Sequence, residues 1–326
     1  MRILITGADG MLGSNLVRLL LERGHQVSVL IHPSSRSTTL EGLDIRKYMG
    51  DVLQPETFDI ALSENEAVIH AAASTNLWPS RSEMVRKINI QGTQNMINGV
   101  LKHHSKLMIY IGSASSVNIA DTSPGKYAFP GAKYRLDYID SKYEALNLVI
   151  DAVKTQGLPA FAILPSFMIG PYDSLPGSGK MILALAQRKL KYYTNGGRNF
   201  IHVKDVSLAI ANSLEIGRVG SVYIAANENI SYQAFFKKVA KIISQPEPKI
   251  YVPDWLVKTI GLFGSLGGII LKKEPLLTYP IARISCDNQF VSAEDSTKEL
   301  KMPQTNIEIA IQDCYDWFIE NSYLKQ

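Results

Sequence analysis

Short apolar runs alternate with helically spaced apolar positions through the first half of the chain. Apolar runs suit buried strands, and apolar residues three and four apart suit helices that cover a sheet. The alternation of the two predicts an α/β fold with a doubly wound parallel sheet, the Rossmann arrangement. The predicted strands are 3–6, 27–31, 67–71, 107–111 and 160–164, and the main predicted helices are 12–23, 82–103 and 136–156.

The pattern loosens after about Pro171. Helices are predicted at 181–188, 206–216 and 307–321, with a strand at 222–225. Because 326 residues exceed what one core usually holds, we expect two units. Residues 1–170 would form the Rossmann domain, to which parts of 198–227 return. Residues 171–326 would form a smaller, mostly C-terminal α/β lobe.

Composition narrows the class of protein. Apolar residues make up 46% and charged residues 20%, which is ordinary for a globular protein. The net charge of +4 comes without a long basic run, so we expect no nucleic-acid partner. Two cysteines, Cys286 and Cys314, and an N-terminus without a signal peptide suggest the cytoplasm. The apolar stretch 255–271 holds Lys258 and four glycines, so we do not expect it to span a membrane. We also expect no metal site.

Three glycines lie where the first strand meets the first helix. Gly7, Gly10 and Gly13 have the spacing G-x-x-G-x-x-G. Glycine permits a tight turn and a close approach of backbone N–H groups, and a helix N-terminus attracts an anion. The turn therefore predicts a site for the pyrophosphate of a dinucleotide, although a plain glycine-rich turn has the same spacing.

The loop after the second strand lacks an acid that could bind the adenosine ribose. No Asp or Glu occurs between Gln26 and Leu40, whereas His32 and Arg36 stand among serines. Because an acid there favours NAD and a base suits a 2′-phosphate, we expect NADP, with NAD as the alternative. Asp51 belongs to the stretch Gly50-Asp51-Val52, which would follow a further strand between residues 31 and 50. Its carboxylate could accept a hydrogen bond from adenine or simply close a turn.

Candidate chemistry comes from a tyrosine, a lysine and a serine. Tyr138 and Lys142 are four residues apart at the start of a predicted helix, so they share one face. An ammonium near the phenol would lower its pKa from about 10, which suits proton transfer to or from a carbonyl or alcohol. A surface pair would show the same spacing. Ser113 follows the predicted strand 107–111 and could bind the substrate oxygen, with Ser115 and Ser116 as competitors.

Seven motifs occur in a fixed order: TGADGMLG, HAAA, KINIQGT, YIGSASSV, YIDSK, LPSFMIGP and NFIHVKDV. In these motifs the chain resembles the extended short-chain dehydrogenases/reductases, the NAD-dependent epimerase/dehydratase family. It is most similar to the dihydroflavonol 4-reductase-like branch. The resemblance covers about residues 1–227 and implies NAD(P)-dependent oxidoreductase activity.

The resemblance assigns roles residue by residue. It makes Tyr138 the acid/base, Lys142 the ribose-binding lysine that lowers the pKa of that tyrosine, and Ser113 the substrate-orienting serine. Asn89 matches an asparagine that supports the active site, and the alternative is that it only holds a helix kink through a water. His202 and Asp205 match a structural motif. The matching cofactor contacts are Gly7, Gly10, Met11, Leu12, Gly13, Asp51, Val52, Ala71, Ala73, Pro165 and Ser166.

Two positions depart from the family pattern. The reductases usually carry Arg where this chain has His32, so Arg36 would have to bind the 2′-phosphate. Gly112 stands where a small hydroxyl residue usually precedes the catalytic serine.

The substrate pocket is expected to be apolar. The second lobe and the stretch 255–271 would contribute to it, and the predicted lining residues are Thr75, Trp78, Ser115 and Phe167. This composition favours reduction of an aldehyde or ketone on an apolar or aromatic small molecule.

Two other functions remain open. A nucleotide-sugar epimerase or dehydratase with bound NAD would need basic residues for a diphosphate, and the candidates are Arg188, Lys189, Lys191 and Arg198, each of which also suits a solvated charge. A non-catalytic NADP-sensing module is the second alternative, but this chain retains the serine, tyrosine and lysine. The helices 82–103 and 136–156 could pair two copies into a homodimer.

Overall fold

The computed structural model describes residues 1–117 and 133–324. Its largest element is a parallel sheet of seven strands in the order β10-β6-β5-β4-β1-β2-β3. This doubly wound order confirms the Rossmann fold, and it opens a crevice at the carboxyl ends of β1 and β4, where the direction of winding reverses. The strands are β1 (Arg2–Thr6), β2 (Gln26–Ile31), β3 (Arg46–Met49), β4 (Ala67–His70), β5 (Leu107–Ile111), β6 (Ala160–Pro165) and β10 (Val222–Ala225).

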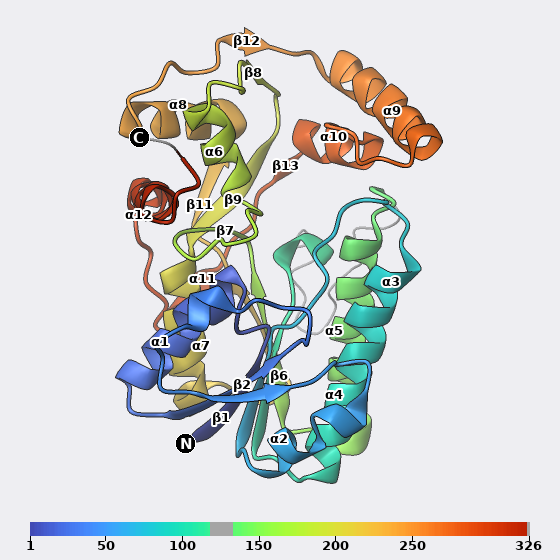
Figure 1. Ribbon diagram of the computed structural model, residues 1–326, viewed down its shortest axis with the longest axis vertical. Coiled ribbons are helices and arrows are strands. Elements are labelled where there is room, and N and C mark those ends of the chain that lie inside the picture. The colour runs from blue at the N-terminus through green and yellow to red at the C-terminus, as the bar shows by residue number, and fades with distance from the viewer. Residues whose placement is uncertain (118–132, 325–326) are drawn as a thin grey trace.

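Helices cover both faces of this sheet (Figure 1). On one face lie α1 (Met11–Glu22) and α7 (Val203–Ile216), and on the other α2 (Asp59–Ser63), α4 (Gly92–Lys102) and α5 (Asp137–Gln156). Side chains of β1 alternate between the two layers, because successive residues of a strand point to opposite faces. Ile3 and Ile5 join the core under α1, whereas Leu4 joins the core under α4 and α5.

The helix predicted at 82–103 is continuous in the structure, but its middle turn is π-helical. It consists of α3 (Glu83–Arg86), the π-helical turn η3 (Lys87–Gln91) and α4. The remaining short turns of this domain are η1 (Thr38–Leu40), η2 (Pro55–Thr57) and η4 (Ala114–Ser116).

The second lobe stands on the carboxyl edge of the large sheet (Figure 1). One sheet joins β7 (Phe167–Ile169), β9 (Gly197–His202), β11 (Glu228–Ser231) and β13 (Asn288–Gln289), and a two-stranded ribbon joins β8 (Tyr192–Tyr193) to β12 (Ile250–Tyr251). Around the larger of these sheets pack α6 (Lys180–Ala186), α8 (Tyr232–Ile242) and α12 (Ile307–Glu320).

The C-terminal third carries three further helices. α9 (Asp254–Leu271) and α10 (Tyr279–Cys286) pack against each other at the outer end of the lobe, and α11 (Glu294–Glu299) returns to β10. In the described part of the chain, α9 is the one helix whose length and composition would allow it to cross a membrane.

Candidate active site

A cleft of about 2190 Å³ lies between the large sheet and the second lobe. Pockets for single small ligands usually measure about 300–1,000 Å³, so this cleft has room for a dinucleotide and a second molecule. The glycine turn lines one part of it and residues of the second lobe line another. Of the predicted site residues, those lining the cleft are Gly7, Gly10, Met11, Leu12, Gly13, Ala71, Ala73, Thr75, Trp78, Ser113, Ser115, Tyr138, Lys142, Pro165, Ser166 and Phe167.

The glycine turn fits a dinucleotide pyrophosphate. Gly7 has φ of +68°, and a Cβ atom there would lie 2.7 Å from the backbone nitrogen of Ala72. A Cβ atom on Gly13 would lie 2.3 Å from the carbonyl oxygen of Gly7. The first amides of α1, those of Met11, Leu12 and Gly13, have no partner within the helix, and its first turn holds no acid. These backbone donors could hold a phosphate at the helix N-terminus.

The loop predicted to select the adenosine end lies beside the glycine turn. Ser35 donates a hydrogen bond from its hydroxyl to the carboxylate of Asp9, a turn residue that also lines the cleft and that the sequence did not single out. His32 and Arg36 are exposed, and neither lines the cleft. The Nδ1 atom of His32 lies 2.7 Å from the hydroxyl of Ser34. The loop is thus close enough to the turn to meet an adenosine ribose.

Asp51 and Val52 also lie outside the cleft lining. One Asp51 oxygen accepts a hydrogen bond from the backbone of Leu53 at 2.9 Å, and the other lies 3.7 Å from Nε2 of His32. The backbone carbonyl of Val52 accepts a hydrogen bond from Asn95 of α4. Asp51 therefore closes its own turn, and its contact with adenine stays a prediction.

Ser113, Tyr138 and Lys142 come together in the cleft. Ser113 directly follows β5, and the other two lie in the first turns of α5. The ammonium of Lys142 is buried and donates a hydrogen bond to the carbonyl oxygen of Ile111, 2.9 Å away. Ser115 lies within reach of Ser113, with 2.8 Å between their hydroxyl oxygens. Ser116 instead turns into the core and donates back to the Ser113 carbonyl, so it is not a competitor.

Burial dominates the ionisation of this group. Burial raises the pKa of Tyr138 above its ordinary value, although the hydrogen bond with Ser113 and the charge of Arg198 act to lower it. The charge that acts to lower this pKa is that of Arg198, so the lowering expected from Lys142 with a bound nicotinamide stays a prediction. Burial also lowers the pKa of Lys142 to about 8. Tyr138 is consequently a neutral phenol near pH 7, able to donate a proton.

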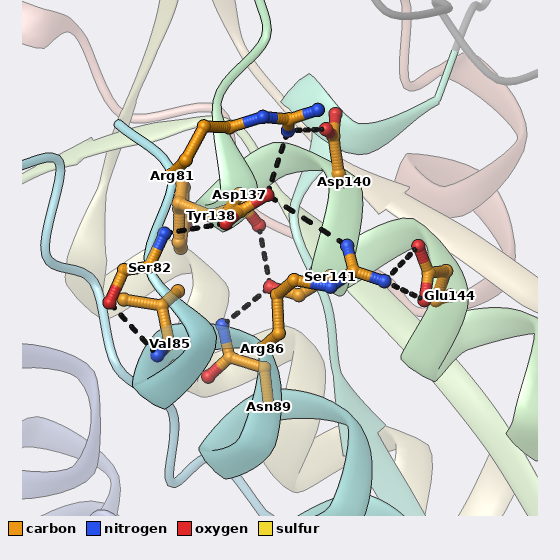
Figure 2. A network of polar contacts seen from close by, with 10 residues as sticks. All are labelled: Arg81, Ser82, Val85, Arg86, Asn89, Asp137, Tyr138, Asp140, Ser141 and Glu144. Atoms are coloured by element: carbon orange, nitrogen blue, oxygen red, sulfur yellow. Dashed lines mark hydrogen bonds and ion pairs between the residues drawn. The ribbon is translucent and has the colours of Figure 1, made fainter. Parts of the chain in front are cut away.

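A network of ion pairs fixes the start of α5 (Figure 2). The Nη1 atom of Arg81 lies 2.7 Å from a carboxylate oxygen of Asp137 and 2.7 Å from a carboxylate oxygen of Asp140. Arg86 pairs with Glu144 at 2.7 Å. Acidic residues in the first turn of a helix also interact favourably with its dipole. Since Tyr138 lies between Asp137 and Asp140 in the sequence, this network helps to fix the position of the Tyr138 phenol.

Asn89 holds the π-helical turn to the catalytic helix directly. Its Nδ2 atom donates to the hydroxyl of Ser141 at 2.9 Å and to the carbonyl of Ser74 at 3.1 Å, and its Oδ1 atom accepts from the Ser74 amide at 2.7 Å. Asn89 thus contacts both segments directly, and Figure 2 shows its bond to Ser141. His202 and Asp205 are structural: His202 caps α7, and Asp205 accepts two hydrogen bonds from Thr305.

The substrate end of the cleft is mainly apolar. Leu256, Val257 and Ile260 of α9 line it with Trp78 and Phe167. The stretch 255–271 therefore contributes a wall, as expected.

Arg198 was interpreted as a solvated charge, and that interpretation is wrong. Its guanidinium lies 4.6 Å from the centre of the Phe167 ring, and its Nε donates to the Tyr232 hydroxyl at 2.8 Å. Within residues 1–117 and 133–324, no carboxylate forms an ion pair with it. Strand alternation places Arg198 on the same face of β9 as Phe200, which is buried in the core of the second lobe, and that signal argued against a fully solvated side chain. The other three basic candidates, Arg188, Lys189 and Lys191, are exposed and outside the cleft lining.

Comparisons with known proteins agree with this geometry. The model of the NAD dependent epimerase/dehydratase family matches residues 3–226. The chain is 30% identical to a putative dihydroflavonol 4-reductase of Synechocystis, over 98% of this chain and 95% of that protein. It is 24% identical to sterol demethylase protein B of Methylococcus capsulatus, over 99% of this chain and all of that protein.

Solved structures share the fold along the whole chain. The crystal structure of gox2253 is 30% identical, with a TM-score of 0.86 and coverage of 99% of both chains. A nucleoside-diphosphate-sugar epimerase from Pseudomonas aeruginosa is 21% identical, with a TM-score of 0.81 and coverage of 100% of this chain and 99% of that one. The chain therefore belongs to the NAD dependent epimerase/dehydratase family and is an NAD(P)-dependent oxidoreductase of its dihydroflavonol 4-reductase-like branch.

Proposed function

We propose that this protein reduces an aldehyde or ketone on an apolar or aromatic molecule, with NADPH as its cofactor. The observation that carries the proposal is the position of the Tyr138 phenol, which faces a cleft with the glycine turn at one end and apolar residues of the second lobe at the other. In this division residues 1–170, with parts of 198–227, hold the cofactor, and residues 171–326 provide most of the substrate pocket.

The chain's own residues would bind, orient and protonate the substrate. When bound, the reduced nicotinamide supplies the hydride. Tyr138 donates its phenolic proton to the carbonyl oxygen as negative charge develops there, and Ser113 donates a hydrogen bond to the same oxygen. The ammonium of Lys142, which donates a hydrogen bond to the Ile111 carbonyl, would bind a ribose hydroxyl.

The ionisation of Tyr138 is compatible with proton donation to a carbonyl. A phenol with the ordinary pKa of about 10 carries its proton at neutral pH, and burial raises the pKa further. A protonated phenol is ready to donate, whereas alcohol oxidation begins with a phenolate that accepts a proton. Arg198, whose charge acts to lower the pKa of this phenol, would stabilise the phenolate left after donation.

The basic loop supports the choice of NADPH. His32 and Arg36 are exposed in the loop that follows β2, and Arg36 pairs with no carboxylate among the described residues. A guanidinium can bind a phosphate through two parallel hydrogen bonds. A 2′-phosphate would therefore find a partner in Arg36, while His32 is drawn towards Asp51.

The first experiment is a titration of purified protein with NADPH and with NADH, followed by cofactor fluorescence. NADPH should bind more tightly, and Arg36→Gln should weaken it about tenfold or more while NADH binding stays the same, because a charge-assisted hydrogen bond contributes about 1.5–3 kcal/mol. Arg46→Gln, an exposed change on β3, is the matched control. Preference for NADH in the wild type would overturn the cofactor assignment.

The second experiment measures turnover on a panel of apolar and aromatic aldehydes and ketones. Tyr138→Phe should lower kcat by about 10²–10⁴ and leave NADPH affinity unchanged, because it removes the proton donor alone. Tyr251→Phe, at an exposed tyrosine outside the cleft lining, is the matched control and should keep wild-type kcat. Absence of turnover across the panel in the wild type would contradict the proposed substrate class.

Arg198 favours a second candidate, conversion of a nucleotide-linked sugar. A cation without an acidic partner inside the cleft suits a diphosphate. This candidate predicts that UDP binds the protein, that Arg198→Met abolishes the binding, and that NAD remains bound through purification. If UDP does not bind, the candidate is wrong.

A further inference from the structure

The side of α9 that faces away from the protein is apolar along its length. Trp255 and Phe263 are each 68% exposed and Ile270 is 78% exposed. The exposed polar residue among them, Thr259, donates its hydroxyl to the carbonyl of Trp255. Figure 1 shows α10 beneath α9 and no other element over its outer side. The exposed large apolar residues of this helix are Trp255, Ile260, Leu262, Phe263, Leu266, Ile269, Ile270 and Leu271.

Glycines seat the opposite side of α9 closely on α10 and on the segment before it. A Cβ atom on Gly261 would lie 2.5 Å from Cβ of Ala282, and one on Gly264 would lie 2.2 Å from the carbonyl oxygen of Leu277. A Cβ atom on Gly268 would meet the Trp78 ring at 2.8 Å. The glycines that argued against a membrane span thus fix the helix along the protein surface. Close packing on the glycine side therefore holds the apolar side of α9 outward.

Cations and aromatic residues flank both ends of this face. Lys272 and Lys273 directly follow α9, and both are exposed. Near its start, the ribbon of β8 and β12 exposes Tyr192 and Tyr251, next to the exposed Lys191 and Lys249. These segments hold fewer acidic residues than lysines. Asp254 lies 3.7 Å from the ammonium of Lys258, so the acids without this pairing are Glu247 and Glu274.

We propose that the outer face of α9 docks on an anionic lipid surface, with the helix lying in the plane of the interface. A helix with an apolar outer face, flanking lysines and aromatic residues at its border has the properties of interfacial helices. Each lysine near an anionic surface contributes about 1 kcal/mol of attraction.

The charges favour lipid over a second copy of this chain. Two copies that paired through α9 about a two-fold axis would meet face to face, since such an interface uses the same patch on both subunits. Because both ends of the patch are basic, lysines would face lysines in either orientation of the two helices. An anionic lipid surface meets the same lysines with opposite charge.

The position of α9 links this surface to the cleft. Leu256, Val257 and Ile260 line the cleft, while Phe263 and Ile270 face outward on the same helix. If the proposed function holds, an apolar carbonyl substrate could pass from the lipid into the cleft along this helix. That step rests on the proposed function, whereas the docking itself does not.

The test is flotation of the full chain with phosphatidylcholine vesicles, with and without phosphatidylglycerol. We expect flotation with the anionic vesicles. The double variant Phe263→Gln/Ile270→Gln should lose at least 90% of this flotation. The reason is that burial of the two side chains contributes about 3–6 kcal/mol, which is more than a hundredfold in affinity. Ile60→Gln/Val219→Gln is the matched control, because both of its sites are exposed apolar residues elsewhere on the molecule, and it should float like the wild type. NADPH binding measured on all three proteins shows whether each is folded.

Two outcomes would overturn the docking proposal. If the wild type fails to float with either vesicle and is monomeric, the face does not bind lipid. If it fails to float but forms a dimer that Phe263→Gln/Ile270→Gln dissociates, a second copy covers the face. Failure of the carbonyl panel while flotation persists would overturn the proposed function and leave the docking surface intact.

Discussion

The Nδ2 atom of Asn89 donates a hydrogen bond to the hydroxyl of Ser141, 2.9 Å away. This bond joins the π-helical turn η3 to α5, one residue before Lys142. The same amide holds the backbone of Ser74, which follows β4 at the entrance to the substrate end of the cleft. One buried side chain therefore ties together the catalytic helix and a segment that lines the cleft.

Replacing Asn89 should lower the rate of catalysis without removing the cofactor site. In Asn89→Leu three hydrogen bonds are lost, each contributing about 0.5–1.5 kcal/mol, and Tyr138 and Lys142 lose part of their support. We expect kcat to fall about tenfold or more, with the Kd of NADPH changed less than threefold. Asn98→Leu, at an exposed site on α4, is the matched control. An unchanged kcat in Asn89→Leu would show that Asn89 does not position the site.

The glycine turn gives a second prediction. Gly13→Ala places a Cβ atom 2.3 Å from the carbonyl oxygen of Gly7, so the turn must open. NADPH affinity should fall at least tenfold, measured by fluorescence titration, and thermal unfolding should move to lower temperature. Gly267→Ala is the control, because nothing lies within 4 Å of a Cβ atom there. That change should leave NADPH binding intact and raise stability by about 0.4–1 kcal/mol.

The order of strands and the glycine turn could be predicted because they depend on local pattern. Buried parallel strands are continuous apolar runs, and a strand–glycine–helix junction carries its own signal. The helix α8 also follows a local pattern, because its apolar residues Phe235, Phe236, Val239 and Ala240 have helical spacing. No helix was predicted there. The main elements of the first domain therefore followed from the sequence alone.

Properties that depend on distant residues could not be predicted. Whether Arg198 is solvated depends on Tyr232 and Phe167, which approach it only through the folding of the second lobe. The pKa of Tyr138 depends on how deeply the phenol is buried, and the spacing to Lys142 carries no information about that. The contacts of Asn89 likewise form only when the loop that follows β4 comes close to the helix α5.

The pairing of Arg81 with α5 should matter for stability and show a pH dependence. Burial raises the pKa of Asp140, and Arg81 opposes that rise. In Arg81→Met the pKa of Asp140 rises further above its unfolded value. A group with a raised folded pKa stabilises the fold at low pH and loses that contribution as pH rises through the folded pKa. The variant should therefore lose about 1–2 kcal/mol at pH 7.5 and less at pH 4.5.

Urea unfolding at the two pH values measures this difference. Arg218→Met is the matched control, because Arg218 is an exposed arginine that pairs with Glu299 at the surface. It should cost less than about 1 kcal/mol, and about the same at both pH values. An Arg81→Met deficit that is equal at pH 4.5 and 7.5 would contradict the role given to Asp140.

His70 connects the glycine-turn strand to the support of the catalytic helix. Its Nδ1 atom lies 2.8 Å from the Thr6 hydroxyl, and its Nε2 atom lies 3.2 Å from the Thr93 hydroxyl. Thr93 in turn donates to the carbonyl of Asn89 at 2.7 Å. The imidazole is fully buried, and burial lowers its pKa from 6.5 to about 3. A neutral histidine is therefore part of the folded structure.

The protein should lose stability in acid through this residue. Below pH 6.5 the unfolded chain binds a proton at His70 that the folded chain does not bind, so the stabilising contribution is complete above pH 6.5 and is lost as pH falls towards 3. At pH 5 the loss is on the order of 2 kcal/mol, since one pKa unit corresponds to about 1.4 kcal/mol. His70→Gln should lower stability at pH 7.5 but weaken its dependence on pH between 7.5 and 5. His104→Gln, at an exposed histidine, should show the wild-type dependence in the same urea-unfolding measurements. An undiminished pH dependence in His70→Gln would place the acid sensitivity elsewhere in the chain.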